Sequence, residues 1–415
     1  MTTSAPAPLW AGRTLVLLGV VIAAANLRTA VAALSPIAGS VSEDIPLDAV
    51  SLGLLGTLPP LCFAVFGLLA PVLQRRARLE TLLVVPLVAI LAGHLLRAVA
   101  PSYPLLAVGS ALAFAGMGVA NVALPPIVKK YFPDRIGLLT SVYATVMSLM
   151  TLLPPLVAVP VADAAGWRVS LGLWAVFTVA ALIPWVGLLL RERAGGDQKT
   201  APVDDTASIA TVPPASAGRT SRSPLAWGMA LMFGTTSLNV YALFAWLPQL
   251  LVEEAGVSDA QAGSLLALYA AVGFPASIIV PVLAVRLRSP RPLIAVGVVF
   301  YLAGYAGLIL SPAVGTWVWV ALAGAGPLLF PLSLVLINLR TRSSAGAVAL
   351  SGFTQGVGYV VGAAGPLVFG VLHEATGGWT VPLLFLVATV CTIAISGSLV
   401  SRPRTLEDDW ARPRP

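Results

Sequence analysis

Residues 14–37 read TLVLLGVVIAAANLRTAVAALSPI, a stretch with a single charged side chain. A helix needs about 20 apolar residues to cross the roughly 30 Å hydrocarbon core of a bilayer, so this stretch predicts a membrane-spanning helix. Eleven similar stretches follow it. The predicted spans are 14–37, 50–73, 80–100, 104–127, 137–160, 169–190, 225–251, 261–285, 292–311, 317–337, 345–371 and 380–400.

The composition of the whole chain agrees with this pattern. Of 415 residues, 58% are hydrophobic and 10% are charged, and the mean hydropathy is +0.93. A segment in lipid must satisfy its own backbone hydrogen bonds, which favours helices. We therefore predict an all-α membrane protein with 12 transmembrane helices and no large soluble domain. A cleaved signal peptide is the alternative for the first stretch, but its apolar run continues to Ile37.

The basic residues follow the predicted topology. Of the 24 Lys and Arg, 21 lie before the first span, after the last one, or in every second gap between spans, while the other gaps carry acids such as Asp44 and Glu253. This positive-inside pattern predicts an inner-membrane protein with an even number of spans and both termini in the cytoplasm. The net charge of +7 is thereby explained without a nucleic-acid partner.

A single long gap divides the spans six and six. Residues 191–224 are rich in Ala, Pro, Ser, Thr and Asp, and we expect a flexible cytoplasmic linker there. The predicted organisation is an N-terminal half over 1–190, this linker, a C-terminal half over 225–400 and a cytoplasmic tail over 401–415.

The two halves share short motifs at offsets of 210 to 212 residues. The matches are Pro71-Val72-Leu73 with Pro281-Val282-Leu283, Pro155-Leu156-Val157 with Pro366-Leu367-Val368, and Gly166-Trp167-Arg168-Val169 with Gly378-Trp379-Thr380-Val381. They predict two parallel six-helix pseudo-repeats, which is the plan of the major facilitator fold. In that plan the solute site lies between the halves near the middle of the membrane.

Segments in both halves resemble the cyanate and nitroimidazole transporter family of this superfamily. They are Asn26-Leu27-Arg28-Thr29-Ala30, Ala120-Asn121-Val122-Ala123-Leu124-Pro125, Ser237-Leu238-Asn239-Val240-Tyr241-Ala242, Trp246-Leu247-Pro248, and residues 350–359, LSGFTQGVGY. The resemblance implies a secondary transporter that works by alternating access on a small solute. One departure concerns residues 67–76, GLLAPVLQRR, which lack the acid that the superfamily usually carries between its second and third spans.

Charge inside the spans identifies the first candidate residue. None of the 17 Asp and Glu lies near the centre of a predicted span. Arg28 lies 15 residues after Arg13, or about 22 Å along a helix, close to the midplane. Its guanidinium suits a planar, carboxylate-like anion. The alternative is that Arg28 joins helices through backbone carbonyls or Asn side chains.

The other charged or titratable residues of the apolar regions are expected nearer the surface. Arg97 lies towards the periplasmic end of its span, where a long side chain can reach the interface. Arg168 lies in a periplasmic connection, and His94 and His373 lie towards the periplasmic edge. We expect none of these four residues in the solute site.

Neutral polar and aromatic residues near mid-span complete the candidate site. Ser351, Gln355 and Tyr359 recur at every fourth residue and so share one helix face. The remaining substrate-binding candidates are Asn239, Tyr241, Tyr269, Asn26, Thr29, Asn121 and Tyr143. Each of them has an alternative role, because polar side chains also join helices in membranes.

No nucleophile with its base, and no His, Cys, Asp or Glu cluster of metal-site spacing, is visible at one depth. We therefore predict a transporter and not an enzyme, without a cofactor or metal. Its partners are the bilayer and a small-molecule solute, and we expect a monomer. A scaffold or signalling role is the alternative from another class.

Two transport hypotheses remain open at this point. In the first, the protein moves a small anion such as cyanate or a compact carboxylate-like compound, held by Arg28. In the second, it exports small heteroaromatic compounds such as nitroimidazoles, stacked on tyrosines. Because no carboxylate lies at mid-membrane, coupling is expected through the solute's own protonation, His94, exchange or facilitated diffusion.

Overall fold

The computed structural model describes residues 13–74, 78–194 and 220–411. All of its regular elements are helical, as predicted for the fold class. Residues 195–219, which make up most of the predicted linker over 191–224, lie outside the described residues. The first half contains α1 (Thr14–Asn26), η1 (Ser35–Ile37), α2 (Ala38–Asp44), α3 (Ala49–Gln74), α4 (Thr81–Ala98), α5 (Tyr103–Tyr131), α6 (Ile136–Ala165), α7 (Trp167–Gly172) and α8 (Ala175–Ala194).

The second half continues in the same manner. It contains α10 (Pro224–Ala255), α11 (Asp259–Arg286), α12 (Arg291–Leu310), α13 (Thr316–Ala325), η2 (Gly326–Leu328), α14 (Leu329–Leu339), α15 (Ser344–Thr376), α16 (Thr380–Val400) and α17 (Leu406–Trp410). Among the described residues, 11 helical stretches are long and apolar enough to cross a bilayer, and α1 is a shorter apolar helix. The twelve predicted spans are therefore present, with the first one in a different form.

The prediction of one continuous helix over 14–37 is wrong. The α-helix ends at Asn26, and residues 27–34 form turns and bends before η1 begins. The side chain of Asn26 donates to the carbonyls of Ile22 and Phe177, at 2.8 and 3.1 Å, and accepts from Thr178 at 2.6 Å. Further along, Pro36 has no backbone N–H to donate to a helix. Hydropathy does not reveal this break because residues 27–34 are apolar apart from Arg28 and Thr29.

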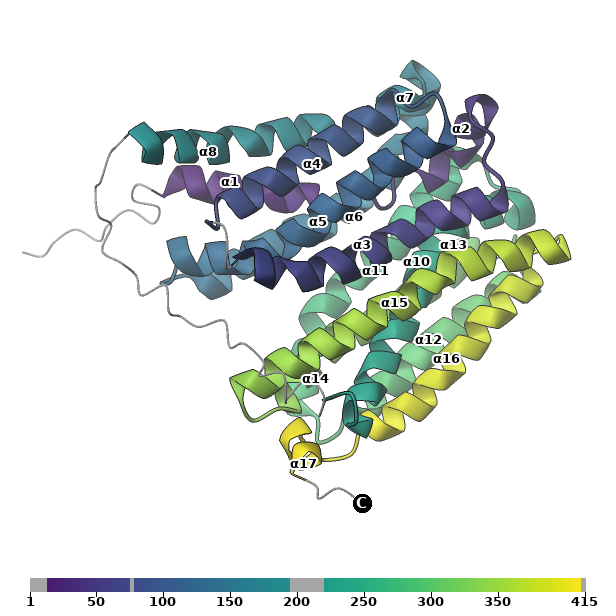
Figure 1. The fold of residues 1–415 in the computed structure, drawn as a ribbon. Coiled ribbons are helices and arrows are strands. Elements are labelled where there is room, and N and C mark those ends of the chain that lie inside the picture. Colours follow the sequence, from purple (N-terminus) through teal and green to yellow (C-terminus); the bar gives the residue numbers. More distant parts are fainter. Residues whose placement is uncertain (1–12, 75–77, 195–219, 412–415) are drawn as a thin grey trace, which may run out of the picture.

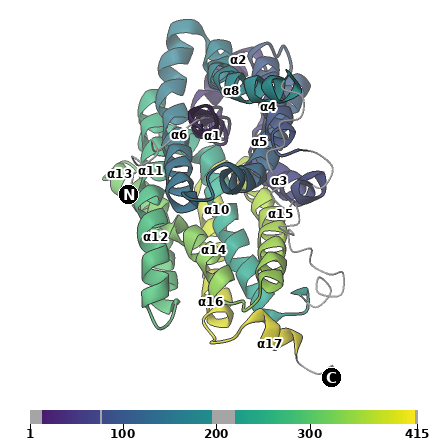
Figure 2. The same ribbon diagram turned by 90° about the vertical axis from the view of Figure 1, so that its left-hand side faces the viewer.

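The two halves contact each other mainly towards one end of the bundle. We call the end where α1 begins and α16 ends the terminal end, and the opposite end, which carries α2 and α7, the far end. Figure 1 shows the halves coming together towards the far end and lying further apart at the terminal end. Helix α3 packs against α15, and α6 packs against α11, at the two sides of the bundle (Figure 2).

Close backbone contacts and hydrogen bonds join the halves. A Cβ atom at Gly263 of α11 would collide with the carbonyl of Pro155 of α6, so a larger residue would separate these helices. The hydroxyl of Ser35 donates to the carbonyl of Phe244 at 2.6 Å, and that of Thr57 donates to the carbonyl of Ala363 at 2.8 Å. These contacts fix the relative position of the halves around the region described next.

Ion pairs at the terminal end join elements within one half. Arg13 pairs with Asp134 at 2.8 Å, and Lys130 pairs with the buried Glu80 at 2.6 Å. The Arg13 guanidinium lowers the pKa of Asp134 to about 2. Burial by itself raises the pKa of Glu80, but hydrogen bonds from Lys130 and Tyr131 outweigh it and hold this pKa below its usual value. Each half is thus tied to itself at this end.

Candidate functional site

A small cavity lies between the two halves, next to the break in the first span. Its volume is about 30 Å³, which is room for roughly two water molecules. Irregular backbone at membrane depth is found where it is buried in protein or lines a cavity. The lining residues are Ala30, Val31, Leu34 and Ser35 of the broken span, Leu52, Leu55, Gly56 and Pro59 of α3, Arg97 of α4, Ser110 and Phe114 of α5, and Tyr241, Phe244 and Ala245 of α10.

Arg28 lies in the same non-helical segment, just before the lining residues of the cavity. It is half-buried, and its guanidinium carbon lies 5.5 Å from the ring centre of Phe63, a cation–π contact. Tyr241 and Tyr359 belong to the same packed cluster as Phe63. Within the described chain, no Asp or Glu forms an ion pair with Arg28.

Four aromatic rings from both halves form a chain of contacts that starts at Phe63 beside Arg28, and we call them the aromatic cluster: Phe63, Tyr359, Phe233 and Phe330. The ring of Tyr359 lies 6.1 Å from Phe63 and 5.1 Å from Phe233, and Phe233 lies 5.0 Å from Phe330. All three pairs meet edge to face, an arrangement that aromatic rings prefer. Tyr359 was among the predicted site residues and the three phenylalanines were not, because hydropathy alone does not distinguish them from packing residues.

The predicted polar face of the eleventh span exists on α15. The amide of Gln355 donates to the hydroxyl of Ser351 at 2.8 Å, and Tyr359 lies one turn further along the helix. Of the other tyrosines, Tyr241 lines the cavity. Tyr269 lies behind it, with its ring 5.6 Å from that of Phe244 and its buried hydroxyl without a hydrogen-bond partner.

Asn239 is the centre of a hydrogen-bond network inside the second half. Its amide donates to the carbonyl of Thr235 at 2.8 Å and to the hydroxyl of Thr389 at 3.0 Å, and its oxygen accepts from Tyr305 at 2.8 Å. These bonds join α10, α12 and α16. Asn239 is fully buried and does not line the cavity.

The remaining predicted site residues lie in the first half, and none lines the cavity. Asn26 is bonded to α8 as described above, and the hydroxyl of Thr29 donates to the carbonyl of Asn26 at 3.4 Å. The amide of Asn121 donates to the carbonyl of Met117 at 3.0 Å, within α5. Tyr143 on α6 is half-buried and packs against the hydrophobic core of this half.

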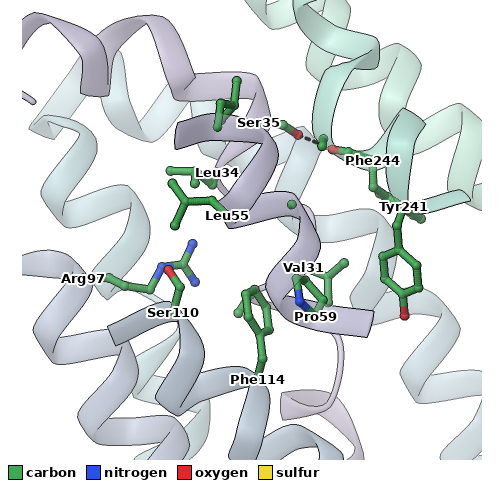
Figure 3. A pocket seen from close by; sticks show the side chains of 14 residues that line it. Val31, Leu34, Ser35, Leu55, Pro59, Arg97, Ser110, Phe114, Tyr241 and Phe244 are labelled. Atoms are coloured by element: carbon green, nitrogen blue, oxygen red, sulfur yellow. Dashed lines mark hydrogen bonds between the residues drawn. The ribbon is translucent and has the colours of Figure 1, made fainter. Parts of the chain in front are cut away.

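The prediction that the side chain of Arg97 reaches the membrane interface is wrong. It is 1% exposed, and its side chain extends from α4 to the cavity with Ser110 beside the guanidinium (Figure 3). The prediction of a surface position for His94 is also wrong, because this ring is fully buried. A Cβ at Gly93 would lie 2.6 Å from the backbone of Gly109, so α4 and α5 approach closely and this face of α4 turns inward.

A helical pattern could have indicated the inward orientation of Arg97. Leu83, Leu87, Ile90, His94 and Arg97 recur at spacings of three and four residues, and all are buried. These spacings place them on one helix face. The prediction for Arg97 rested on its distance along the span. That distance gives the depth of a residue but not the helix face on which it lies.

Other site chemistries find no support in the described part of the chain. Glu80 is its only buried acid, and that side chain is occupied by Lys130 and Tyr131 at the terminal end. No group of three or more His, Cys, Asp or Glu side chains there could hold a metal ion. The arrangement thus offers two arginines, hydroxyls and aromatic rings between the halves.

The fold and sequence were compared with known proteins. A family model described as Major Facilitator Superfamily matches residues 16–363. A bacterial homologue of the human lysosomal transporter Spinster, in an inward-facing and unoccupied conformation, superposes with a TM-score of 0.73 at 16% identity, covering 99% of this chain and 100% of that one. At such identity the likeness shows a common fold.

Two curated relatives share more of the sequence. The 2-nitroimidazole transporter of Escherichia coli (strain K12) is 32% identical over 95% of this chain and 97% of its own length. The cyanate transport protein CynX of the same organism is 26% identical over 89% of this chain and 92% of its own length. The chain therefore belongs to the major facilitator superfamily of transporters, and within it resembles the cyanate and nitroimidazole transporter family.

Proposed function

We propose that this protein moves a small anion across the membrane by alternating access, and that Arg28 binds the anion between the halves. The proposal rests on one observation above all: Arg28 is half-buried beside a break in its span, with aromatic rings as neighbours and no ion-pair partner among the described residues. A charge at the centre of a span costs about 2.5–3.5 kcal/mol on insertion scales and is usually retained for function. An anionic solute offsets that cost.

The solute class follows from the chemistry of the guanidinium. Its planar donors suit a delocalised anion such as cyanate or a compact carboxylate, and the relative CynX is named for cyanate transport. We assign Tyr241, Tyr359 and Gln355 to the same site as neutral donors and rings, with Gln355 one turn from Tyr359 on α15. Asn239 is left out of the proposed site because its polar atoms are already bonded within the second half.

Topology and coupling belong to the same proposal. The distribution of basic residues supports an inner-membrane protein with the terminal end in the cytoplasm. We propose that it acts as a monomer. Because the described spans hold no free carboxylate at mid-depth, we infer that coupling does not use one. Exchange of anions, or co-transport of a proton carried by the solute, fits these residues better.

The alternative is export of small heteroaromatic compounds. The aromatic cluster favours it, since Phe63, Phe233, Phe330 and Tyr359 offer ring faces and edges to a planar solute. The relative from Escherichia coli named as a 2-nitroimidazole transporter supports the same alternative. The two hypotheses differ in whether Arg28 or the rings carry the selectivity.

Transport by purified protein in proteoliposomes tests the proposal. Proteoliposomes that contain the wild type, Arg28→Ala or Arg28→Lys are loaded with unlabelled cyanate. They are then assayed for counterflow of labelled cyanate. Arg168→Ala is the matched control, because Arg168 belongs to the same half but is exposed and paired with Asp44. We expect counterflow in the wild type and the control, none in Arg28→Ala and little in Arg28→Lys. Counterflow at the wild-type rate in Arg28→Ala would overturn the assignment of Arg28.

A further inference from the structure

Arg97 is a second intramembrane arginine that the proposed mechanism does not use. Its side chain is almost completely enclosed, and its Nε and Nη1 atoms are buried without a hydrogen-bond partner. The described acids form no ion pair with it. The hydroxyl oxygen of Ser110, which lies beside the guanidinium in Figure 3, is also buried without a partner.

Such an arrangement is unfavourable for the protein by itself. Buried charges are normally paired, and buried donors normally find an acceptor, because each was hydrogen-bonded to water in the unfolded chain. Here the guanidinium of Arg97 and the hydroxyl of Ser110 both line the same cavity. The nearest titratable neighbour on α4 is His94, and a histidine carries no negative charge, so it cannot serve as a counter-ion. An anion in the cavity supplies both the missing charge and the missing acceptors.

The cavity sets the size of that anion and shows that both halves hold it. At about 30 Å³ it accommodates an anion of two or three heavy atoms and excludes a nitroimidazole-sized molecule in this conformation. Its walls include Leu55 and Pro59 from the first half, and Tyr241 and Phe244 from the second. Movement of one half against the other would therefore open or close it.

The position along α3 separates this cavity from Arg28. Pro59 is the last residue of α3 that lines the cavity, and Phe63, which lies under Arg28, comes four residues later and therefore about 6 Å closer to the terminal end. Tyr241 lines the cavity and also belongs to the packed cluster of Phe63, the ring under Arg28. The two arginines thus lie one after the other on the path between the halves.

We propose that Arg97 and Ser110 form a second subsite for a small monovalent anion, on the far side of Arg28. The subsite receives the anion as it enters or leaves at the far end, while Arg28 holds it nearer the terminal end. This proposal rests on the proposed function for the anionic nature of the solute and for the role of Arg28. The anion bound at this subsite is either a transported solute or a permanently bound chloride.

Calorimetric titration of the purified full-length protein with formate, in a chloride-free buffer of constant ionic strength, tests the subsite. Formamide serves as the neutral molecule of similar shape. We expect two formate sites in the wild type and one in Arg28→Gln. In the double variant Arg28→Gln/Arg97→Gln, we expect affinity at least about tenfold weaker than in Arg28→Gln. Arg168→Gln is the control for loss of an exposed arginine and keeps both sites.

Two further variants make the result independent of the folding of Arg97→Gln. Ser110→Asp places a carboxylate beside the guanidinium, so we expect it to lose the second formate site and to unfold at a higher temperature. Ser110→Ala keeps the charge and is expected to weaken this site several-fold. Formate binding to Ser110→Asp with two sites of wild-type affinity would overturn the proposal.

The remaining outcomes separate this subsite from the proposed function. If the wild type has one formate site that Arg28→Gln removes and Arg97→Gln leaves unchanged, the second subsite is overturned and the proposed function stands. If the wild type binds no formate, cyanate or nitrite, both are overturned. Repeating the titration with chloride identifies the source: a chloride site that formate displaces and that Arg97→Gln abolishes supports the subsite as part of the solute path.

Discussion

Two regions of this protein, the network of Asn239 in the second half and the arginines Arg28 and Arg97 in the first, hold polar groups between helices in opposite ways. In the second half, the amide of Asn239 is bonded to Thr235, Thr389 and Tyr305, so its donors and its acceptor are satisfied within the protein. In the first half, Arg28 and Arg97 carry full charges without an ion-pair partner among the described residues. From the sequence, Arg28 and Asn239 were both predicted in the solute site, and Arg97 was predicted near the membrane surface.

The difference shows how joining helices can be distinguished from binding a solute in a membrane protein. Interhelical hydrogen bonds between neutral groups stabilise a bundle modestly, and they are complete without a ligand. An arginine without a counter-ion keeps an unpaired charge and unpaired hydrogen-bond donors, and a bound anion pairs both. We therefore expect substitutions in the network of Asn239 to change stability, and substitutions at the arginines to change binding and transport.

The largest expected effect is the loss of transport in Arg28→Ala without a loss of stability. Removing an uncompensated charge does not break a bond within the protein, so the melting temperature in anion-free buffer should stay the same or rise. The rate of anion counterflow should fall by about 100-fold or more, equivalent to roughly 2.7 kcal/mol. Thermal unfolding and counterflow measured on the same preparation check both parts. A variant that loses transport only because it unfolds would contradict the comparison.

Asn239→Ala should show the reverse behaviour. It leaves Tyr305 and Thr389 without their partner and should lower the free energy of unfolding by about 1–2 kcal/mol. The apparent KM for the anion should stay close to that of the wild type. Tyr305→Phe, which removes only one hydroxyl of the network, is the matched variant and should have a smaller effect. A large rise of KM with unchanged stability would return Asn239 to the binding site.

Tyr359→Ala should have a moderate effect on binding. It removes the ring that contacts both Phe63 and Phe233, and aromatic pairs contribute about 0.5–1.5 kcal/mol beyond their buried area. The apparent KM should therefore rise about two- to tenfold. Tyr359→Phe keeps the ring and separates the role of the hydroxyl. Unchanged kinetics in Tyr359→Ala would assign the ring to packing.

The smallest expected effect concerns Glu80, a buried charge that does have a partner. Its pKa is held below the unfolded value by Lys130 and Tyr131, so the ionised form stabilises the folded protein. This stability is present above the unfolded pKa and is lost as the pH falls through the lowered pKa of the folded state. Glu80→Gln should melt below the wild type at neutral pH, and the difference should vanish in acid. Melting curves between about pH 7 and pH 3 measure it, and a difference that persists unchanged at the acidic limit would contradict this account.

Much of the fold followed from the sequence because hydropathy and charge are strong signals in a membrane protein. Apolar stretches of sufficient length predicted the spans, and three repeated motifs predicted the parallel halves. The break after Asn26 did not follow, because it depends on hydrogen bonds to Phe177 and Thr178, which lie about 150 residues away in the chain. Residues 27–34 have the same apolar character as a helix.

The candidate site was predictable only in part, for a related reason. The depth of Arg28 could be counted along its span, and the repeat at every fourth residue predicted the face shared by Ser351, Gln355 and Tyr359. The orientation of Arg97 depends on the close packing of α4 against α5 at Gly93 and Gly109. The sequence could not show that packing, and it could not show that Asn239 finds partners on two other helices.

The most direct test of the central claim, that the region between the halves selects its solute by charge, is a ligand screen by thermal unfolding of the purified wild type. It compares formate and cyanate with neutral formamide and with 2-nitroimidazole. A ligand that binds only the folded state at 100 times its Kd stabilises that state by about 2.7 kcal/mol. The account predicts that the two anions raise the melting temperature and that formamide does not. Stabilisation by 2-nitroimidazole alone, with no effect of either anion, would contradict it.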